Sequence, residues 1–142
     1  MKHIIHCLIL FPLLIGARTV DYQLTVAEKN VTPKGKTSTA LAINDSIPSP
    51  TLYFNEGDEA RIEVRNNLKN EPTSLHWHGL LLPNDQDRVP FLTAPQINPG
   101  SSLTYHFPLT NPGTYWYHSH AGLQEQRGLY GAIVVRPAVS GC

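Results

Sequence analysis

The sequence predicts an all-β domain, a sandwich or barrel of about seven or eight antiparallel strands. Apolar residues alternate with polar ones in several stretches, which is the period of a half-buried strand. Short segments rich in proline, glycine and asparagine separate these stretches, and no stretch keeps a helical period for long. The 142 residues include 12 prolines and 10 glycines, as many turns require, and their number suits a single domain.

Four stretches show the alternation clearly, and each places its apolar side chains on one face. In chain order these faces are Val20, Tyr22, Leu24 and Val26; Leu52 and Phe54; Ala60, Ile62 and Val64; and Leu103, Tyr105 and Phe107. Turns are expected at residues 32–35, 55–58, 98–100 and 111–113. Residues 132–135 form an unbroken apolar run, so we expect the last strand, residues 131–136, to be buried on both faces.

Residues 1–17 are expected to be a signal peptide and residues 18–142 the folded domain. Lys2 precedes an almost unbroken apolar run at residues 4–15, and the small residues Gly16 and Ala17 follow it. The run is short of the roughly 20 residues that a transmembrane helix needs. A cleaved signal with a mature end near Arg18 places the chain in the periplasm or outside the cell, with no membrane attachment. The alternative is an uncleaved anchor.

The charge balance argues against some classes of binding partner, and the cysteine content argues against an internal disulfide. Lysine plus arginine equals aspartate plus glutamate at 11 each, so no net field attracts nucleic acid or an anionic membrane. Cys7 lies in the expected signal and Cys142 is the last residue, so cleavage leaves one cysteine and no internal disulfide. A chain that stops on Cys142 suggests a truncation before later domains.

Two His-x-His pairs are the strongest indication of chemistry. His76 and His78 form one pair and His118 and His120 the other, each beside aromatic residues. Residues i and i+2 of a strand point to one face about 6.5 Å apart, so each pair can converge on one metal ion or two neighbouring ions. Neutral imidazole suits copper, zinc, iron and nickel, with copper(II) highest in the affinity order. His106 alternates with apolar residues and is expected to face solvent.

Hydrolytic chemistry has less support. Ser119 lies between His118 and His120, but on a strand its side chain points away from both, and no glycine-flanked nucleophile turn surrounds it. Zinc hydrolases usually recruit a carboxylate or cysteine ligand close by, and neither pair offers one in sequence.

The segments Thr73-Ser74-Leu75-His76-Trp77-His78-Gly79 and Gly113-Thr114-Tyr115-Trp116-Tyr117-His118-Ser119-His120 resemble the two copper motifs in the first cupredoxin domain of multicopper oxidases. Residues 42–52, 56–58, 80–84, 122–126 and 128–131 are similar to the periplasmic copper-resistance oxidases of bacteria within that family. The resemblance runs from about Tyr22 to Pro137 and implies a cupredoxin-like Greek-key β-sandwich.

The resemblance also implies a site and its partners. His76 would bind the type 2 copper, and His78, His118 and His120 would bind the type 3 pair. C-terminal cupredoxin domains would supply the other ligands of this trinuclear cluster, where oxygen is reduced to water. Asp87, eleven positions after His76, matches an acidic residue thought to deliver protons to bound oxygen. Neighbouring aromatics such as Trp77 and Trp116 would wall the site.

Two departures from the family pattern are visible. Arg88 stands where the family usually has glycine, in Asp-Arg-Val instead of Asp-Gly-Val. No His-Cys-His segment occurs, so the type 1 copper ligands are missing from this sequence and the chain alone is expected to be catalytically incomplete.

Two functions therefore stay open. The first is a domain of an oxidase that couples the oxidation of copper(I) or phenols to the reduction of oxygen. The second is a non-enzymatic periplasmic module that sequesters or carries copper. A structural domain with vacant histidines is a third, weaker reading. The ligands account for binding in either of the first two cases, and the reading frame beyond Cys142 would discriminate between them.

Overall fold

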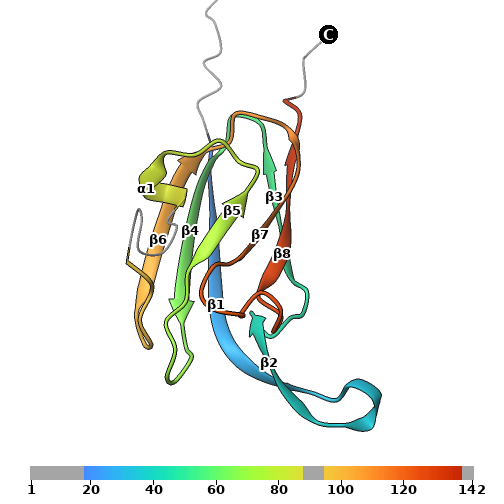
Figure 1. Cartoon of the computed structure of the whole chain (residues 1–142). Helices are drawn as coiled ribbons and strands as arrows, with labels where there is room; N and C mark the ends of the chain where they lie inside the picture. The colour runs from blue at the N-terminus through green and yellow to red at the C-terminus, as the bar shows by residue number, and fades with distance from the viewer. Residues whose placement is uncertain (1–17, 88–94, 139–142) are drawn as a thin grey trace, which may run out of the picture.

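The computed structural model describes residues 18–87 and 95–138, which form a sandwich of two four-stranded sheets (Figure 1). The elements are β1 (Thr19–Val31), η1 (Pro33–Gly35), β2 (Ser38–Ile43), β3 (Ser49–Asn55), β4 (Glu59–Asn66), β5 (Leu75–His78), α1 (Asn84–Asp87), β6 (Ser102–Pro108), β7 (Gly113–Ser119) and β8 (Tyr130–Arg136). One sheet has the order β2-β1-β4-β6 and the other β3-β8-β7-β5. The all-β prediction is confirmed, and among the described residues only short helical turns interrupt the strands.

Both sheets are mixed, where the sequence suggested antiparallel pairing throughout. β1 runs parallel to β4, and β3 runs parallel to β8, while the remaining neighbours are antiparallel. Each parallel pair joins strands that are not consecutive in the chain, so the connection crosses from one sheet to the other between them. Alternation of apolar residues fixes which face is buried but carries no information on strand direction.

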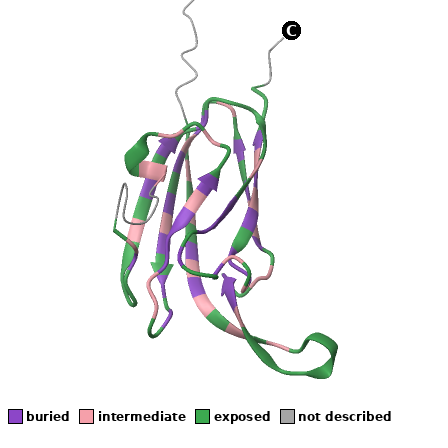
Figure 2. Ribbon diagram, in the orientation of Figure 1, coloured by how far each residue is buried: buried purple, intermediate pink, exposed green. Residues whose placement is uncertain are grey.

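The core lies between the sheets and is built from the faces that alternation predicted. Every second residue of β4 is buried, and buried residues also alternate with more exposed ones in β6 and β8 (Figure 2). Trp77 of β5 is completely buried, with its ring centroid 5.0 Å from Tyr105 and 5.4 Å from Phe107 of the opposite sheet. Truncating a buried tryptophan to alanine typically costs about 3–5 kcal/mol, so Trp77 is a principal anchor of β5.

The prediction for the last strand is wrong in one respect. In β8, Gly131, Ile133 and Val135 are buried, but Ala132 and Val134 on the other face are only half-buried. The apolar run therefore marks a one-sided strand, because nothing in the described chain covers its outer face completely.

Several predictions fall on residues outside the described ranges: the signal peptide at residues 1–17 with Cys7, the Arg88 position, and Cys142. Within residues 18–87 and 95–138, no helix has the length and apolar composition needed to cross a membrane.

Candidate metal centre

The two His-x-His pairs belong to adjacent strands at the outer face of the second sheet, and His120 lies one residue beyond the end of β7. β5 and β7 pair antiparallel, with His76 directly opposite His118 and His78 opposite Trp116. Their alternate residues, Trp77 and Tyr117, face each other in the core. Successive side chains of a strand point to opposite faces, so the apolar side chains pack in the core while the imidazoles point away from it.

Three of the four histidines form a compact group. His76, His118 and His120 each offer a ring nitrogen, and these atoms all lie within 4.8 Å of one another. The ring centroids are 4.5 Å apart for His76 and His120, 4.9 Å for His118 and His120, and 5.4 Å for His76 and His118. His78 lies at the edge of this group, 5.5 Å from His76 and 5.6 Å from His118 between ring centroids.

Two carboxylates hold one histidine of each pair by its Nδ1 atom. Asp87 Oδ1 lies 2.6 Å from His76 Nδ1, and Glu125 Oε2 lies 3.0 Å from His118 Nδ1. Both acids come from outside the sheet: Asp87 ends α1, and Glu125 belongs to the loop between β7 and β8. The exposed partners His78 and His120 have no such carboxylate among the described residues.

The short α1 is tethered to the edge strand β6. Gln86 Oε1 accepts a hydrogen bond of 2.8 Å from the backbone N–H of His106, and α1 lies beside β6 in Figure 1. This contact fixes the turn that carries Asp87. His106 itself is exposed, as predicted, and its ring lies 3.5 Å from Glu59, away from the other histidines.

The surroundings of the histidines favour their neutral form. Loss of water around the buried ring lowers the pKa of His118 below its ordinary value of 6.5, against the opposing effects of a backbone carbonyl and of Glu125. The pKa of His120 is also lowered, first because its ring loses water and then because His76 and His118 lie close. Only neutral imidazole can ligate a metal, so these shifts favour ligation.

One buried atom is suited to a metal. His118 Nε2 is buried and accepts no hydrogen bond from the described residues. Buried polar atoms are normally paired, and an unpaired nitrogen on a ring that lies beside two other imidazoles is where a cation would be expected. Nitrogen ligands and two nearby carboxylates fit a divalent transition metal such as copper(II).

The aromatic residues divide between the site and the core. The Trp116 ring stacks on His118 with centroids 4.1 Å apart and an interplanar angle of 21°, so it walls the site as expected. Trp77 does not, because it occupies the inward face of β5 and is buried in the core. Ser119 also points inward and is buried, which removes the basis for a nucleophile between the histidines.

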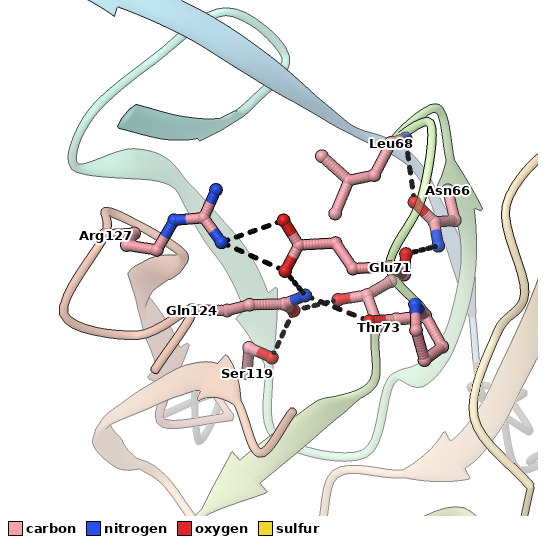
Figure 3. Close-up of polar contacts among 8 residues, drawn as sticks. Asn66, Leu68, Glu71, Thr73, Ser119, Gln124 and Arg127 are labelled. Atoms are coloured by element: carbon pink, nitrogen blue, oxygen red, sulfur yellow. Dashed lines mark hydrogen bonds and ion pairs between the residues drawn. The ribbon is translucent and has the colours of Figure 1, made fainter. Parts of the chain in front are cut away.

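A polar network behind the histidine strand anchors its end (Figure 3). Buried Gln124 uses both ends of its amide. Its Oε1 accepts from Thr73 Oγ1 and Ser119 Oγ, each at 2.8 Å, and its Nε2 donates to Glu71 Oε2 at 3.0 Å and Pro72 O at 2.9 Å. The sequence carries no signal for this network, because the partners of its residues are remote in the chain.

Glu71 completes the network with an ion pair. Arg127 Nη1 lies 2.8 Å from Glu71 Oε1 and 2.9 Å from Oε2, as Figure 3 shows. The pKa of Glu71 is lowered, mainly by the hydrogen bond from Gln124 and also by Arg127, against the effect of partial burial. The loop at residues 121–128 is thereby fixed to the segment that precedes β5.

Comparison with known proteins gives one consistent answer. Residues 25–140 match the family profile described as multicopper oxidase. Copper resistance protein A of Escherichia coli is 44% identical over 124 residues, which are 87% of this chain and 20% of that protein. The crystal structure of a multi-copper oxidase from Pseudomonas thermotolerans superposes with a TM-score of 0.81 at 34% identity, covering 86% of this chain and 30% of that one.

A laccase from Botrytis aclada is similarly close, with a TM-score of 0.80 at 41% identity, over 85% of this chain and 23% of the laccase. The chain therefore spans about a fifth of the length of the copper resistance protein that it matches.

Proposed function

The chain belongs to the multicopper oxidase family, and we propose that it acts as the first, copper-binding domain of an oxidoreductase. The observation that carries this proposal is the convergence of His76, His118 and His120 from two motifs about 40 residues apart in the sequence. The similarity to a copper resistance protein and a laccase supports copper(I) or phenols as the reducing substrate and oxygen as the oxidant.

In this proposal the four histidines supply half of the ligands of a trinuclear copper site. His76 serves the type 2 position, and His78, His118 and His120 serve the type 3 pair. Copper at such a site supplies redox chemistry, by which electrons reach oxygen. Further cupredoxin domains contribute the remaining ligands, which agrees with the small fraction of its relatives that this chain spans.

Asp87 has two parts in the proposed mechanism. Its carboxylate oxygen lies 2.6 Å from His76 Nδ1, in an ion-pair contact that helps to orient the His76 ring beside the neighbouring histidines. The Asp87 side chain is also about one-third exposed, so it can take up protons from solvent beside the site. We therefore propose that Asp87 delivers protons to oxygen at the site.

The proposal includes export to the periplasm or the outside of the cell, on the strength of the apolar segment at residues 4–15. A copper carrier without turnover is the competing function. It differs in one measurable respect, since a longer chain that includes the proposed further cupredoxin domains would then consume no oxygen.

Competition between copper(II) and zinc tests the proposal. We expect the purified chain to prefer copper(II), and alanine at His76, His118 or His120 to weaken binding by well over tenfold, because each removes one ligand. The matched control is His106→Ala, an exposed histidine outside the group, which should leave the affinity unchanged. Preference for zinc at equal concentration, or equal losses in the control, would show that the assignment is wrong.

A further inference from the structure

His118 is the most buried of the four histidines, and its two ring nitrogens lie in different environments. Its Nδ1 faces two groups, Glu125 Oε2 at 3.0 Å and the backbone carbonyl of Ser119 at 3.3 Å. Its Nε2 is buried without a hydrogen-bond partner in the described chain. The side chain is only 7% exposed, so water does not readily replace these contacts.

When Glu125 is ionised, neither group beside Nδ1 can donate a hydrogen bond, and both can only accept one. A neutral imidazole carries its proton on one nitrogen and a lone pair on the other. Two acceptors at Nδ1 therefore require the proton to lie there, which leaves the lone pair on Nε2, the buried atom without a hydrogen-bond partner in the described chain. The carbonyl contact is the hydrogen bond of the two, and the shorter contact with the Glu125 carboxylate is an ion pair that adds a second, charged acceptor beside the same atom.

The position of Glu125 is itself fixed. The preceding residue, Gln124, is 2% exposed and makes four hydrogen bonds, one of them to Ser119, the neighbour of His118. The Ser119 hydroxyl also accepts from the backbone N–H of Ala121 at 3.0 Å, at the start of the same loop. The loop that carries Glu125 and the strand end that carries His118 are thus locked together.

We propose that Glu125 is a positioning residue of the metal site, whose carboxylate accepts the Nδ1 proton of His118 and presents Nε2 to the cation. Carboxylates that orient ligating histidines in this way commonly contribute ten- to a hundredfold to metal affinity. The inference rests on the proposed function only in naming copper as the cation, since the contacts at His118 are present without it.

The test compares Glu125→Ala, Glu125→Gln and the control Glu28→Gln, an exposed glutamate in the β1–β2 hairpin. Two quantities are measured on the full chain: the tautomer of His118, from ¹⁵N chemical shifts of its ring without metal near pH 8, and the copper(II) affinity against a chromophoric chelator. We expect the wild type to hold the Nδ1–H tautomer. Glu125→Ala should move the ring toward the Nε2–H form and weaken copper binding about ten- to a hundredfold.

Glu125→Gln retains an amide oxygen that can accept the Nδ1 proton, so it should keep the tautomer and most of the affinity. Unchanged tautomer and affinity in Glu125→Ala would overturn the proposal, because the Ser119 carbonyl would then be sufficient. Equal losses in the alanine and glutamine variants would also overturn it, because charge rather than orientation would be responsible. A shifted tautomer in a chain that binds no copper would support the positioning role and contradict the proposed function instead.

Discussion

Replacing Gln124 with methionine tests how far the site depends on the network behind it. The substitution keeps an unbranched side chain of similar length but removes four hydrogen bonds. Thr73 and Ser119, which lose their acceptor, are 0% and 3% exposed, so water cannot easily replace it. At about 1 kcal/mol net per hydrogen bond, and with roughly 1 kcal/mol returned by the more apolar side chain, we expect a loss of about 3 kcal/mol.

Urea unfolding followed by the fluorescence of buried Trp77 measures this loss, with the free energy of unfolding taken at constant slope. The matched control is Gln126→Met in the same loop, an exposed residue for which we expect a change within about 0.5 kcal/mol. Copper affinity should also fall in Gln124→Met, because Glu125 and Ser119 lose their anchor. A loss below about 1 kcal/mol, equal to that of the control, would refute the reasoning.

Two further predictions concern the core and the site. Gly131→Ala should destabilise the domain by about 1–3 kcal/mol in the same urea assay, because a Cβ there would lie 2.6 Å from the ring of buried Tyr117, whose hydroxyl donates to Pro50 O. Copper(II) affinity, measured by chelator competition from pH 8 to 5, should fall toward the acid end, because only neutral imidazole ligates; the lowered pKa values of His118 and His120 delay their protonation, so a decline that is complete above pH 6.5 would contradict this.

The fold class could be predicted because burial in this domain follows a simple period. Leu24 and Val26 of β1 and Ala60, Ile62 and Val64 of β4 all lie in the core, as alternation indicated. Strand direction could not be predicted, because the parallel pairing of β1 with β4 depends on which sheet each strand joins. The error at β8 has a related cause, since an apolar run does not reveal whether both faces are covered.

The candidate ligands could be predicted because their spacing is local. His76 with His78, and His118 with His120, needed only the period of a strand, and the resemblance to a known family singled out Asp87. The expectation that Trp77 walls the site is wrong, because neighbouring residues of a strand face opposite ways, so a residue next to a ligand in sequence lies on the other face of the sheet.

Glu125 and Gln124 were missed for a different reason. Their partners lie across the fold: Gln124 is 51 residues from Thr73 and 53 residues from Glu71. A glutamine between a glycine-leucine pair and a glutamate has no periodic or motif signature that indicates burial. Only the folded chain brings these residues together, and contacts of this kind are the part of a site that a single sequence does not predict.

In both His-x-His pairs the two histidines differ in burial and in contact with a carboxylate, and this difference bears on how a metal would be bound. In each pair one histidine, His76 or His118, stands in the ladder opposite the other and is held by a carboxylate. The second histidine of each pair, His78 or His120, is exposed and forms no ion pair with a carboxylate of the described residues.

The held histidines have already lost most of their rotational freedom, so they can bind an ion with little further cost in side-chain entropy. The exposed histidines still have that freedom and would lose it only when the ion arrives. The cost in side-chain entropy of binding an ion would therefore fall mainly on His78 and His120. Asp87 and Glu125 have the same structural task in this arrangement, since each lies beside Nδ1 of one buried or half-buried histidine.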